Sequence, residues 1–220
     1  MAKYLVIDLE MCRVPKCMKK EYGFRTEIIQ IGAVKLNSKY EIEDKFSIYV
    51  KPEFGTIDSE IKRLTGISNE DVYDAMYLED ALKEFCKWMG RSKYVAVSWS
   101  DSDLVQFQKE LAEKEIACKK IENLYEGWFD AQSLFGEKLD TTKQYNLTEA
   151  LIAADIVEEG RTHDGLSDAY NTAKLFGKMK KEKEFKLNTL YFEAKYVEPT
   201  RLTSTIGDLF AGLNLQAFPA

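Results

Sequence analysis

Two carboxylates stand at the end of the most apolar segment near the start of the chain. The segment YLVIDLEMC, residues 4 to 12, runs through apolar residues directly into Asp8 and Glu10. Alternate side chains of a strand point to the same face, so these two carboxylates share one face about 7 Å apart. Like charges on a half-buried face raise each other's pKa and cost stability unless a cation lies between them. The pair indicates either a divalent-cation site or a strand that reaches the surface at Asp8.

A further acid follows a second apolar strand. In VSWSDSDLVQF, residues 97 to 107, Ser100 and Asp101 are natural N-cap residues for the helix that follows. This register leaves Asp103 in the first helical turn, beside the apolar stripe of that helix. An acid in a first turn also complements the helix dipole. By itself this segment therefore fits a metal ligand and a purely structural role equally well.

A third segment, THDGLSDAYNTAKLF (residues 162 to 176), contains His163, the only histidine of the chain. Asp164 is expected to cap a helix, which puts His163 just before that helix and Asp168 in its first turns. At 100° per residue, Asp168 shares a stripe with residues expected to face the core: Thr172, Leu175 and Met179. The polar positions expected to face elsewhere are Ser167, Asn171, Lys174 and Lys178. Asp168 is thus an acid at the end of a core-facing sector.

These acids and the histidine form a set that suits metal-dependent hydrolysis. Hard divalent cations prefer several carboxylate oxygens, and two carboxylates on one strand can bridge a pair of ions. Two ions about 4 Å apart can hold the attacking and leaving oxygens of a phosphoryl displacement. A histidine, whose pKa lies near neutrality, can take the proton from the attacking water. On this interpretation the acids end the buried strand in order to hold metal.

The elements that must position this set are predicted from composition and periodicity. Strands are expected over residues 3–9, 27–36, 44–52 and 93–99, with a shorter one near 123–130. Helices are expected over 59–68 with a turn at Gly66, and over 77–90, 102–117, 131–138, 147–154 and 165–181. Strands that come first and then alternate with helices predict an α/β fold with a mixed sheet and helices packed on it. Beyond residue 182 the pattern weakens.

Composition limits the kinds of partner. The formal net charge of the 220 residues is −6, so a nucleic-acid partner must be held locally or through metal ions and not by a broad basic face. The four cysteines do not complete a zinc site and are expected to be free thiols in a reducing cytoplasm. The N-terminal apolar run is too short for a signal peptide, and none reaches the roughly 20 residues that cross a bilayer. We expect a cytoplasmic protein without a membrane partner, and the sequence assigns no oligomeric state.

The motifs resemble those of a known enzyme family. IDLE with Asp8 and Glu10, then Asp103 after a strand ending in SW, then HDGLSD with His163 and Asp168 resemble the three motifs of the DEDDh 3′–5′ exonucleases. The order of the motifs and the H-x4-D spacing both match. The branch that looks most similar contains histone-mRNA 3′-exonucleases and bacterial sporulation-inhibitor exonucleases. The likeness covers roughly residues 3–180, and includes RTEIIQIGAVKLN as a second strand and LTGI as a substrate loop.

The resemblance implies a ribonuclease-H-like fold, with a five-stranded mixed sheet flanked by helices, over an exonuclease domain of residues 1–181. Residues 182–220 would be a C-terminal extension of unknown role. The implied reaction releases nucleoside 5′-monophosphates one at a time from single-stranded RNA or DNA 3′ ends. Two Mg²⁺ or Mn²⁺ ions would be held by four carboxylates, with His163 as the general base: Asp8, Glu10, Asp103 and Asp168.

The resemblance also implies a substrate-binding set. Met11 would approach the terminal nucleotide, and the LTGI loop would wedge against the terminal bases through Leu64, Thr65, Gly66 and Ile67. Trp99 could stack on a base, although the sequence favours core packing for this residue. The basic loop over residues 13–25 could hold substrate phosphates or be a solvated loop.

Two other functions compete with the exonuclease. A non-catalytic nucleic-acid-binding protein that kept the fold gains nothing from clustered carboxylates facing phosphates without metal. A carboxylate-pair glycosidase would use Asp8 and Glu10 as acid and base without metal. Chelation separates the exonuclease from the glycosidase, because EDTA should abolish the nuclease and spare the glycosidase.

Overall fold

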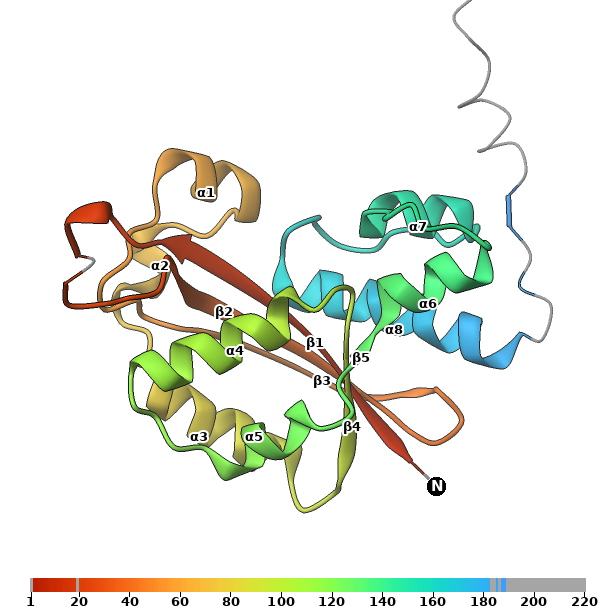
Figure 1. Cartoon of the computed structure of the whole chain (residues 1–220), viewed down its shortest axis with the longest axis horizontal. Coiled ribbons are helices and arrows are strands. Elements are labelled where there is room, and N and C mark those ends of the chain that lie inside the picture. The colour runs from red at the N-terminus through yellow and green to blue at the C-terminus, as the bar shows by residue number, and fades with distance from the viewer. Residues whose placement is uncertain (1, 19, 183–184, 186, 189–220) are drawn as a thin grey trace, which may run out of the picture. The chain divides into compact units, whose positions relative to one another are not determined.

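The computed structural model describes residues 2–18, 20–182, 185 and 187–188, which form a five-stranded sheet with helices on both faces (Figure 1). The strands run in the order β3-β2-β1-β4-β5. Their bounds are β1 Lys3–Arg13, β2 Thr26–Leu36, β3 Ile42–Tyr49, β4 Tyr94–Ser98 and β5 Phe129–Asp130. β1 pairs antiparallel with β2, which pairs antiparallel with β3, whereas β4 is parallel to both β1 and β5. The expected mixed five-stranded sheet is confirmed.

Eight α-helices lie in the part of the chain that the structure describes. Their bounds are α1 Ser59–Thr65, α2 Asn69–Tyr73, α3 Leu78–Met89, α4 Ser102–Glu113, α5 Lys119–Tyr125, α6 Ala131–Lys138, α7 Leu147–Ala153 and α8 Gly165–Lys181. A short 3-10 turn, Lys16–Met18, lies in the loop between β1 and β2. None of the described helices has the length and apolar character needed to span a bilayer.

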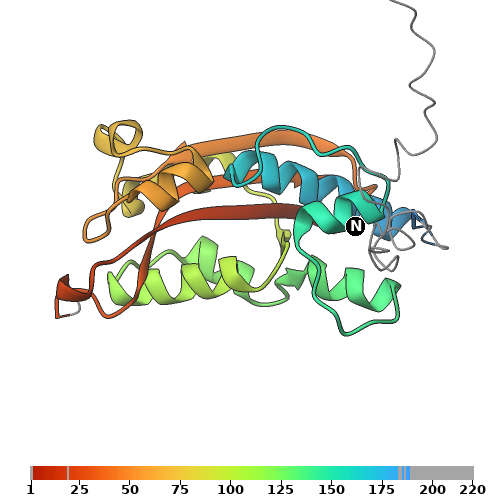
Figure 2. The same cartoon turned by 90° about the horizontal axis from the view of Figure 1, so that it is seen from above.

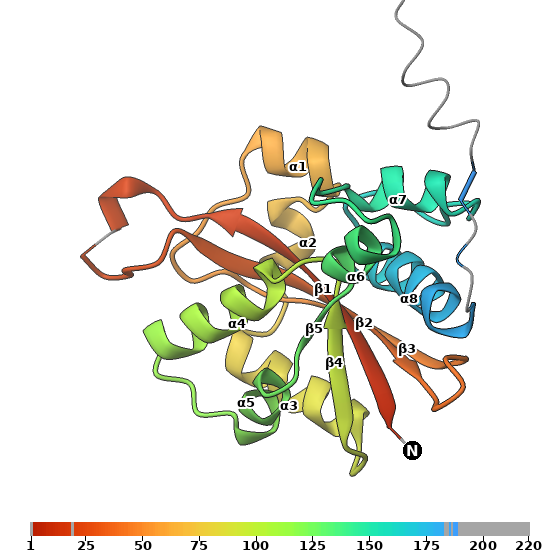
Figure 3. The same cartoon turned by 45° about the vertical axis from the view of Figure 1, so that its right-hand side comes forward.

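The helices form two layers. The apolar residues of α3, α4 and α5 share one buried cluster with Leu5, Ile7 and Leu9 of β1. On the other face α8 contacts β1, β2 and β3, and α1 packs on β1. Figure 2 shows α8 and α4 on opposite sides of β1, and Figure 3 shows α6 and α7 beside α8, which both helices contact. β1 therefore lies in the middle of the molecule, as its apolar composition predicts.

A register shift between Glu10 and Met11 lets β2 supply apolar side chains to both layers. Ile28 belongs to the cluster on the α4 side, whereas Ile29 belongs to a second cluster with residues of α1 and α2. One extra residue in a strand turns the following side chains to the opposite face. Ile28 and Ile31, three positions apart, therefore face the same cluster.

Several element bounds differ from the sequence expectations. β1 continues to Arg13, beyond the expected end at residue 9. α4 ends at Glu113 instead of Ala117, because Glu115 takes a left-handed backbone conformation with φ 53°. The expected strand near 123–130 is only Phe129–Asp130, and the residues before it form α5 with Ile121 and Leu124 buried at helical spacing. α2 is a helix that the periodicity did not predict.

Chain contacts group Met1–Leu187 into one compact unit. The expected C-terminal extension over 182–220 falls almost wholly outside the described residues. All sites discussed below belong to this unit.

Candidate active site

A pocket of about 510 Å³ lies along the free edge of β1. The pairing of β1 with β4 ends at Val6 and Val97, and among the described residues only an isolated bridge of Arg13 with Thr56 continues on that side of β1. One wall comes from α1, and the other comes from the end of β4 and the start of α4. The residues that line the pocket are Asp8, Leu9, Glu10, Met11, Arg13, Thr26, Ile61, Leu64, Thr65, Trp99, Ser100, Ser102, Asp103, Gln132, Asn146, Leu147, His163 and Asp168. All five residues of the acid–histidine set are therefore in one pocket.

Asp103 is placed by the backbone of β1. The Leu9 N–H donates to Asp103 Oδ1 at 2.9 Å, which replaces the strand partner that β4 does not supply. Asp103 is only 6% exposed, whereas Asp101 is exposed and makes no side-chain capping bond. The structure thus turns Asp103 inward and leaves Asp101 outside the pocket, which is the arrangement that the helix register predicts.

The inner face of α4 carries a buried polar stripe that sequence reasoning missed. Gln106 and Glu110 follow Asp103 at helical spacing and are both buried. Thr26 Oγ1 donates to Gln106 Oε1 at 2.7 Å, and the Ile28 N–H donates to Glu110 Oε2 at 2.9 Å. Three polar residues at i, i+3 and i+7 beside an apolar stripe were the available signal. Their bonds to β1 and β2 fix the rotation of α4 and hence the position of Asp103.

The start of α8 is held directly on the sheet. A methyl group at Gly32 would overlap the backbone of Gly165, so the close approach of α8 to β2 requires glycine at that position. The buried Gln30 side chain accepts from the Gly165 N–H at 2.9 Å and donates to Asp164 Oδ2 at 3.1 Å. These contacts set the start of α8, and therefore Asp168, against the carboxylates of β1.

Asp168 is buried, and only one of its two carboxylate oxygens is hydrogen-bonded among the described residues. Its Oδ2 accepts from the His163 N–H at 2.9 Å, whereas Oδ1 has no hydrogen-bond partner among the described residues. Asp164 caps α8 by accepting from the Ser167 N–H at 2.9 Å, as predicted. Asn171 was expected on a polar sector away from the core but is buried, because its amide bonds to the backbone of Glu159. That expectation was wrong.

His163 lies exposed at the mouth of the pocket with a left-handed backbone, φ 60°. A ligand atom of His163, one of Glu10 and one of Asp168 all lie within 4.8 Å of one another. The backbone bond to Asp168 holds the residue while its imidazole stays accessible. Such an arrangement lets the ring exchange protons with solvent near two carboxylates.

Burial and mutual repulsion raise the pKa of every carboxyl group in the cluster. Burial, followed by the charges of Asp103 and Glu10, raises the pKa of Asp8 well above its usual value. Burial and Asp168 raise the pKa of Glu10 to about 8. Burial raises the pKa of Asp103 to about 7 and that of Asp168 to about 6. The four groups resist carrying four charges together unless positive charge is present.

This donor set fits a hard divalent cation. It consists of carboxylates that converge from β1, α4 and α8, and it includes a buried Asp168 oxygen with no hydrogen-bond partner among the described residues. Oxygen donors of this kind are the ligands of Mg²⁺ and Mn²⁺. A bound cation would also relieve the repulsion that raises the carboxyl pKa values.

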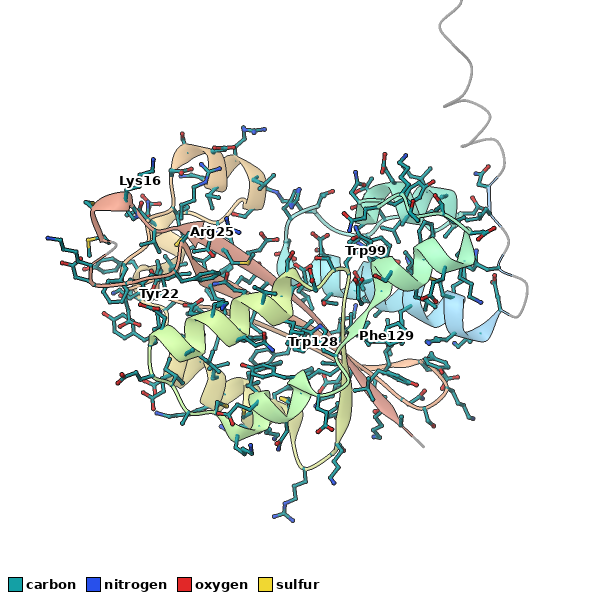
Figure 4. The ribbon with its side chains drawn as sticks, in the orientation of Figure 1. Lys16, Tyr22, Arg25, Trp99, Trp128 and Phe129 are labelled. Atoms are coloured by element: carbon teal, nitrogen blue, oxygen red, sulfur yellow. The ribbon has the colours of Figure 1, made fainter. Side chains whose placement is uncertain are left out.

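The structure places four of the six predicted substrate-binding residues at the pocket and two elsewhere. Met11, Leu64, Thr65 and Trp99 line the pocket. Gly66 instead ends α1 in a left-handed conformation with φ 77°, and Ile67 is 2% exposed in the cluster beneath α1. Trp99 (Figure 4) is mostly buried and donates its indole N–H to Tyr145 O at 3.1 Å, so it packs in the core while one side borders the pocket.

Arg161 is a further residue near the site that sequence reasoning missed. Its guanidinium packs on Gly66 and donates to the carbonyls of Arg63 at 3.0 Å and Leu64 at 3.4 Å. Arg161 thereby joins the loop that carries His163 to the end of α1. A basic residue two positions before the histidine gave no chemical signal, because its partners are backbone groups almost a hundred residues away.

The basic loop between β1 and β2 extends from the same end of the sheet. Arg13 pairs with Asp58 at 3.3 Å and Glu60 at 2.6 Å. Lys16 and Arg25 (Figure 4) take no part in the ion pairs of the described residues. Buried Tyr22 anchors the loop by donating to Thr26 O at 3.0 Å and stacking on Phe54. The loop is therefore fixed at its base, and Lys16 and Arg25 are exposed without an ion-pair partner among the described residues.

Comparison with known proteins gives a consistent result. Residues 5–176 match the RNase_T family, described as Exonuclease. The chain is 32% identical over 199 residues to ERI1 exoribonuclease 2 of Xenopus laevis, which covers 80% of this chain and 28% of that protein. It is 30% identical over 168 residues to 3′-5′ exoribonuclease 1 of Rattus norvegicus, which covers 71% of this chain and 47% of that protein. The chain thus spans less than half the length of these two relatives.

A solved structure has the same fold. The nuclease domain of 3′hExo, a DEDDh family member bound to rAMP, superposes with a TM-score of 0.67 at 23% identity, covering 84% of this chain and 96% of that one. The expected ribonuclease-H-like fold is therefore confirmed.

Proposed function

The chain belongs to the exonuclease family, and on that premise we propose that it is a metal-dependent 3′–5′ exonuclease. It would remove nucleoside 5′-monophosphates one at a time from single-stranded RNA or DNA. Both relatives described above are named exoribonucleases, which supports RNA as the first substrate to test beside its DNA counterpart.

One observation carries the proposal. Four carboxylates from three different elements meet His163 in one pocket, and every one of these carboxyl groups has a raised pKa. A binding protein without metal would gain only repulsion toward phosphate from this cluster. A hydrolase gains cation ligands and a proton acceptor from the same residues.

We assign the cation ligands to Asp8, Glu10, Asp103 and Asp168, with two Mg²⁺ or Mn²⁺ ions as the cofactor. When bound, such ions supply positive charge that stabilises the attacking and leaving oxygens of a phosphodiester. Without cations these carboxylates would repel the substrate backbone, so activity should depend strictly on the metal.

The protein's own residues would position the reacting groups. His163 would accept the proton of the attacking water, because its imidazole is exposed at the pocket mouth beside Glu10 and Asp168. Leu64 from α1 and Met11 from β1 would offer apolar surface to the terminal base, since both line the pocket. Leu64 is 39% exposed, which suits contact with a ligand more than a core role.

The test uses a 5′-labelled single-stranded RNA and a DNA of the same sequence, each with Mn²⁺ and with EDTA. We expect a ladder that shortens from the 3′ end, is lost with EDTA and returns when excess Mn²⁺ is added. Asp8→Ala should abolish the ladder while the protein still folds. Asp101→Ala is the matched control, because Asp101 is an exposed neighbouring acid that does not line the pocket.

Two outcomes would reject the proposal. Tight binding of either strand without cleavage, in a protein whose metal binding is confirmed by calorimetry, would favour a non-catalytic binding protein. Cleavage that survives EDTA would exclude the carboxylate cluster as a cation site.

A further inference from the structure

Two cysteines outside the active-site pocket lie side by side. The sulfur atoms of Cys86 and Cys118 are 3.6 Å apart, although the residues are 32 positions apart in the chain. Cys86 lies in α3, and Cys118 is the N-cap residue of α5. Both side chains are partly buried against the apolar cluster beneath the sheet, and neither lines the pocket.

The two thiols are chemically unequal. The Cys86 thiol, together with the backbone N–H groups of Ile121 and Lys120, lowers the pKa of Cys118 to about 6 against an opposing effect of burial. The same thiol–thiol bond and burial raise the pKa of Cys86. The thiolate is the reactive form of cysteine, so Cys118 is the nucleophile of the pair.

Other charged or titratable groups surround the pair. The Lys120 ammonium donates to Cys86 O at 2.5 Å and to Gly90 O, and its charge opposes the rise in the pKa of the Cys86 thiol. Glu122 acts against the Cys118 thiolate, and Tyr125 is the remaining titratable neighbour. The backbone N–H groups of Ile121 and Lys120 thus favour a thiolate at Cys118, whereas the Lys120 ammonium acts on Cys86.

We propose that Cys86 and Cys118 form a redox modification site, at which a low-molecular-weight disulfide oxidises them to an intramolecular disulfide. A disulfide needs a sulfur separation of about 2.05 Å. Two sulfurs already in contact need only small side-chain rotations to reach it, and one of them belongs to a residue at a helix end. The other two cysteines are unsuited, because Cys12 is buried and Cys17 is exposed, and neither is hydrogen-bonded to another thiol in the described part of the chain.

The oxidation proceeds by two thiol–disulfide exchanges. The Cys118 thiolate attacks one sulfur of oxidised glutathione, the S–S bond of glutathione breaks, and one glutathione thiolate leaves. The Cys86 thiol then gives its proton to solvent and attacks the Cys118 sulfur of the mixed disulfide, which releases the second glutathione thiolate. Two protein thiols are oxidised, and one glutathione disulfide is reduced to two thiols.

The crosslink would connect α3 to the start of α5 and enclose the segment that contains β4 and α4. A disulfide that closes a loop of this length restricts the unfolded chain more than the folded chain. The melting temperature of the oxidised protein should therefore rise, by roughly 5 to 10 °C for a chain of this size.

The experiment incubates the full chain with defined ratios of oxidised to reduced glutathione at pH 7.5, quenches with acid and alkylates the remaining thiols. We expect the intact mass to fall by two hydrogens, with peptides containing Cys86 and Cys118 joined and with Cys12 and Cys17 alkylated. In Cys86→Ser, Cys118 should instead accumulate a glutathione adduct, because no second thiol resolves it. Cys17→Ser is the control and should form the internal disulfide as the unaltered chain does.

The proposal fails if both thiols of the unaltered chain stay alkylatable when oxidised glutathione is in large excess. It also fails if the disulfides that form involve Cys17, or if the crosslinked protein melts no higher than the reduced one. The mass measurement on the unaltered chain decides the question even if a variant does not fold, and it does not depend on nuclease activity.

Discussion

Glu10 lies where a buried strand meets three other acids, and its protonation is linked to folding. Its pKa rises to about 8, and those of Asp103 and Asp168 rise to about 7 and about 6. In an unfolded chain such groups titrate near pH 4. The folded chain therefore binds more protons than the unfolded chain over the intervening range, so the free energy of unfolding falls as pH rises.

We accordingly expect the chelated protein to lose stability progressively between about pH 4 and about pH 8. Urea unfolding in EDTA at pH 5 and pH 8 measures this change. Glu10→Gln should raise the unfolding midpoint at pH 8 and leave it nearly unchanged at pH 5, because the amide carries no charge at either pH. Glu137→Gln, at an exposed position of α6, is the control. Equal effects of the two substitutions at pH 8 would contradict the prediction.

The backbone of His163 decides which substitution tests its role. Its φ of 60° suits asparagine better than alanine, since asparagine tolerates the left-handed region. We expect His163→Asn to keep the melting temperature and the Mn²⁺ affinity while turnover falls by about 10²–10⁴, the usual scale for loss of a general base. Steady-state kinetics and calorimetry on the same sample check both. Unchanged turnover would remove His163 from the proposed mechanism.

At the scale of elements, the position of α8 against β2 depends on the absence of a side chain at Gly32. Gly32 has no Cβ, and the start of α8 occupies the space that a Cβ would fill. Gly32→Ala should therefore push α8 away from β2 and cost about 3 kcal/mol or more of stability, because backbone atoms cannot move aside as a side chain can. Denaturant unfolding measures the loss. Gly127→Ala is the control, because no heavy atom of the described residues lies within 4 Å of the place that a Cβ would take there. An alanine side chain at its φ of 81° should cost only about 1–2 kcal/mol of stability.

Arg161 connects two elements that both border the pocket. Its two bonds to the end of α1 hold the His163 loop against the helix that carries Leu64. Arg161→Lys keeps the charge but loses the forked geometry, so we expect kcat/KM to fall about tenfold while the melting temperature changes little. The pH profile of kcat should change as well, because His163 loses its support. Arg63→Lys, which keeps the accepting backbone carbonyl, is the matched control. A fall in stability without a kinetic change would reduce Arg161 to a structural role.

At the scale of the whole molecule, a buried ion cluster joins the two layers through β2. Lys114 Nζ lies 2.7 Å from a carboxylate oxygen of Glu27 and 3.0 Å from one of Glu53 and one of Glu110. The side chains of Lys114, Glu27 and Glu110 are almost wholly buried, whereas that of Glu53 is partly exposed. Although burial opposes its charge, Glu110 and Glu27 raise the pKa of the Lys114 ammonium. Glu27 also accepts backbone N–H groups of the loop before α1, including that of Phe54 at 2.8 Å.

Lys114→Met should destabilise the protein by about 3–5 kcal/mol, because it leaves Glu27 and Glu110 as buried negative charges without a positive charge beside them. Adding Glu110→Gln to that variant should recover part of the loss. Urea unfolding of the single and double variants measures the coupling. Independent, additive effects of the two substitutions would show that the cluster does not act as a unit.

The sequence by itself determined most of the elements and the identity of the acids. Apolar runs and helical periodicity placed β2, α3 and α8 near their observed bounds and gave the start of β1, because each of these buries a continuous face. The carboxylates of β1 could be recognised because a strand of this composition has no packing use for two charges on one face. The helix register likewise separates Asp103 from Asp101 in the sequence alone.

Only the tertiary structure decided how these residues meet. The polar stripe of α4, the contact between Gly32 and Gly165 and the bonds of Arg161 to α1 all join segments far apart in sequence. The partners of Glu110, Gly32 and Arg161 are backbone groups, which carry no sequence signal. The same holds for Cys86 and Cys118, whose spacing predicts nothing until α3 and α5 pack together. The local sequence pattern shows which face of a helix or strand is buried. Only the packing of the folded chain determines which residues lie against that face.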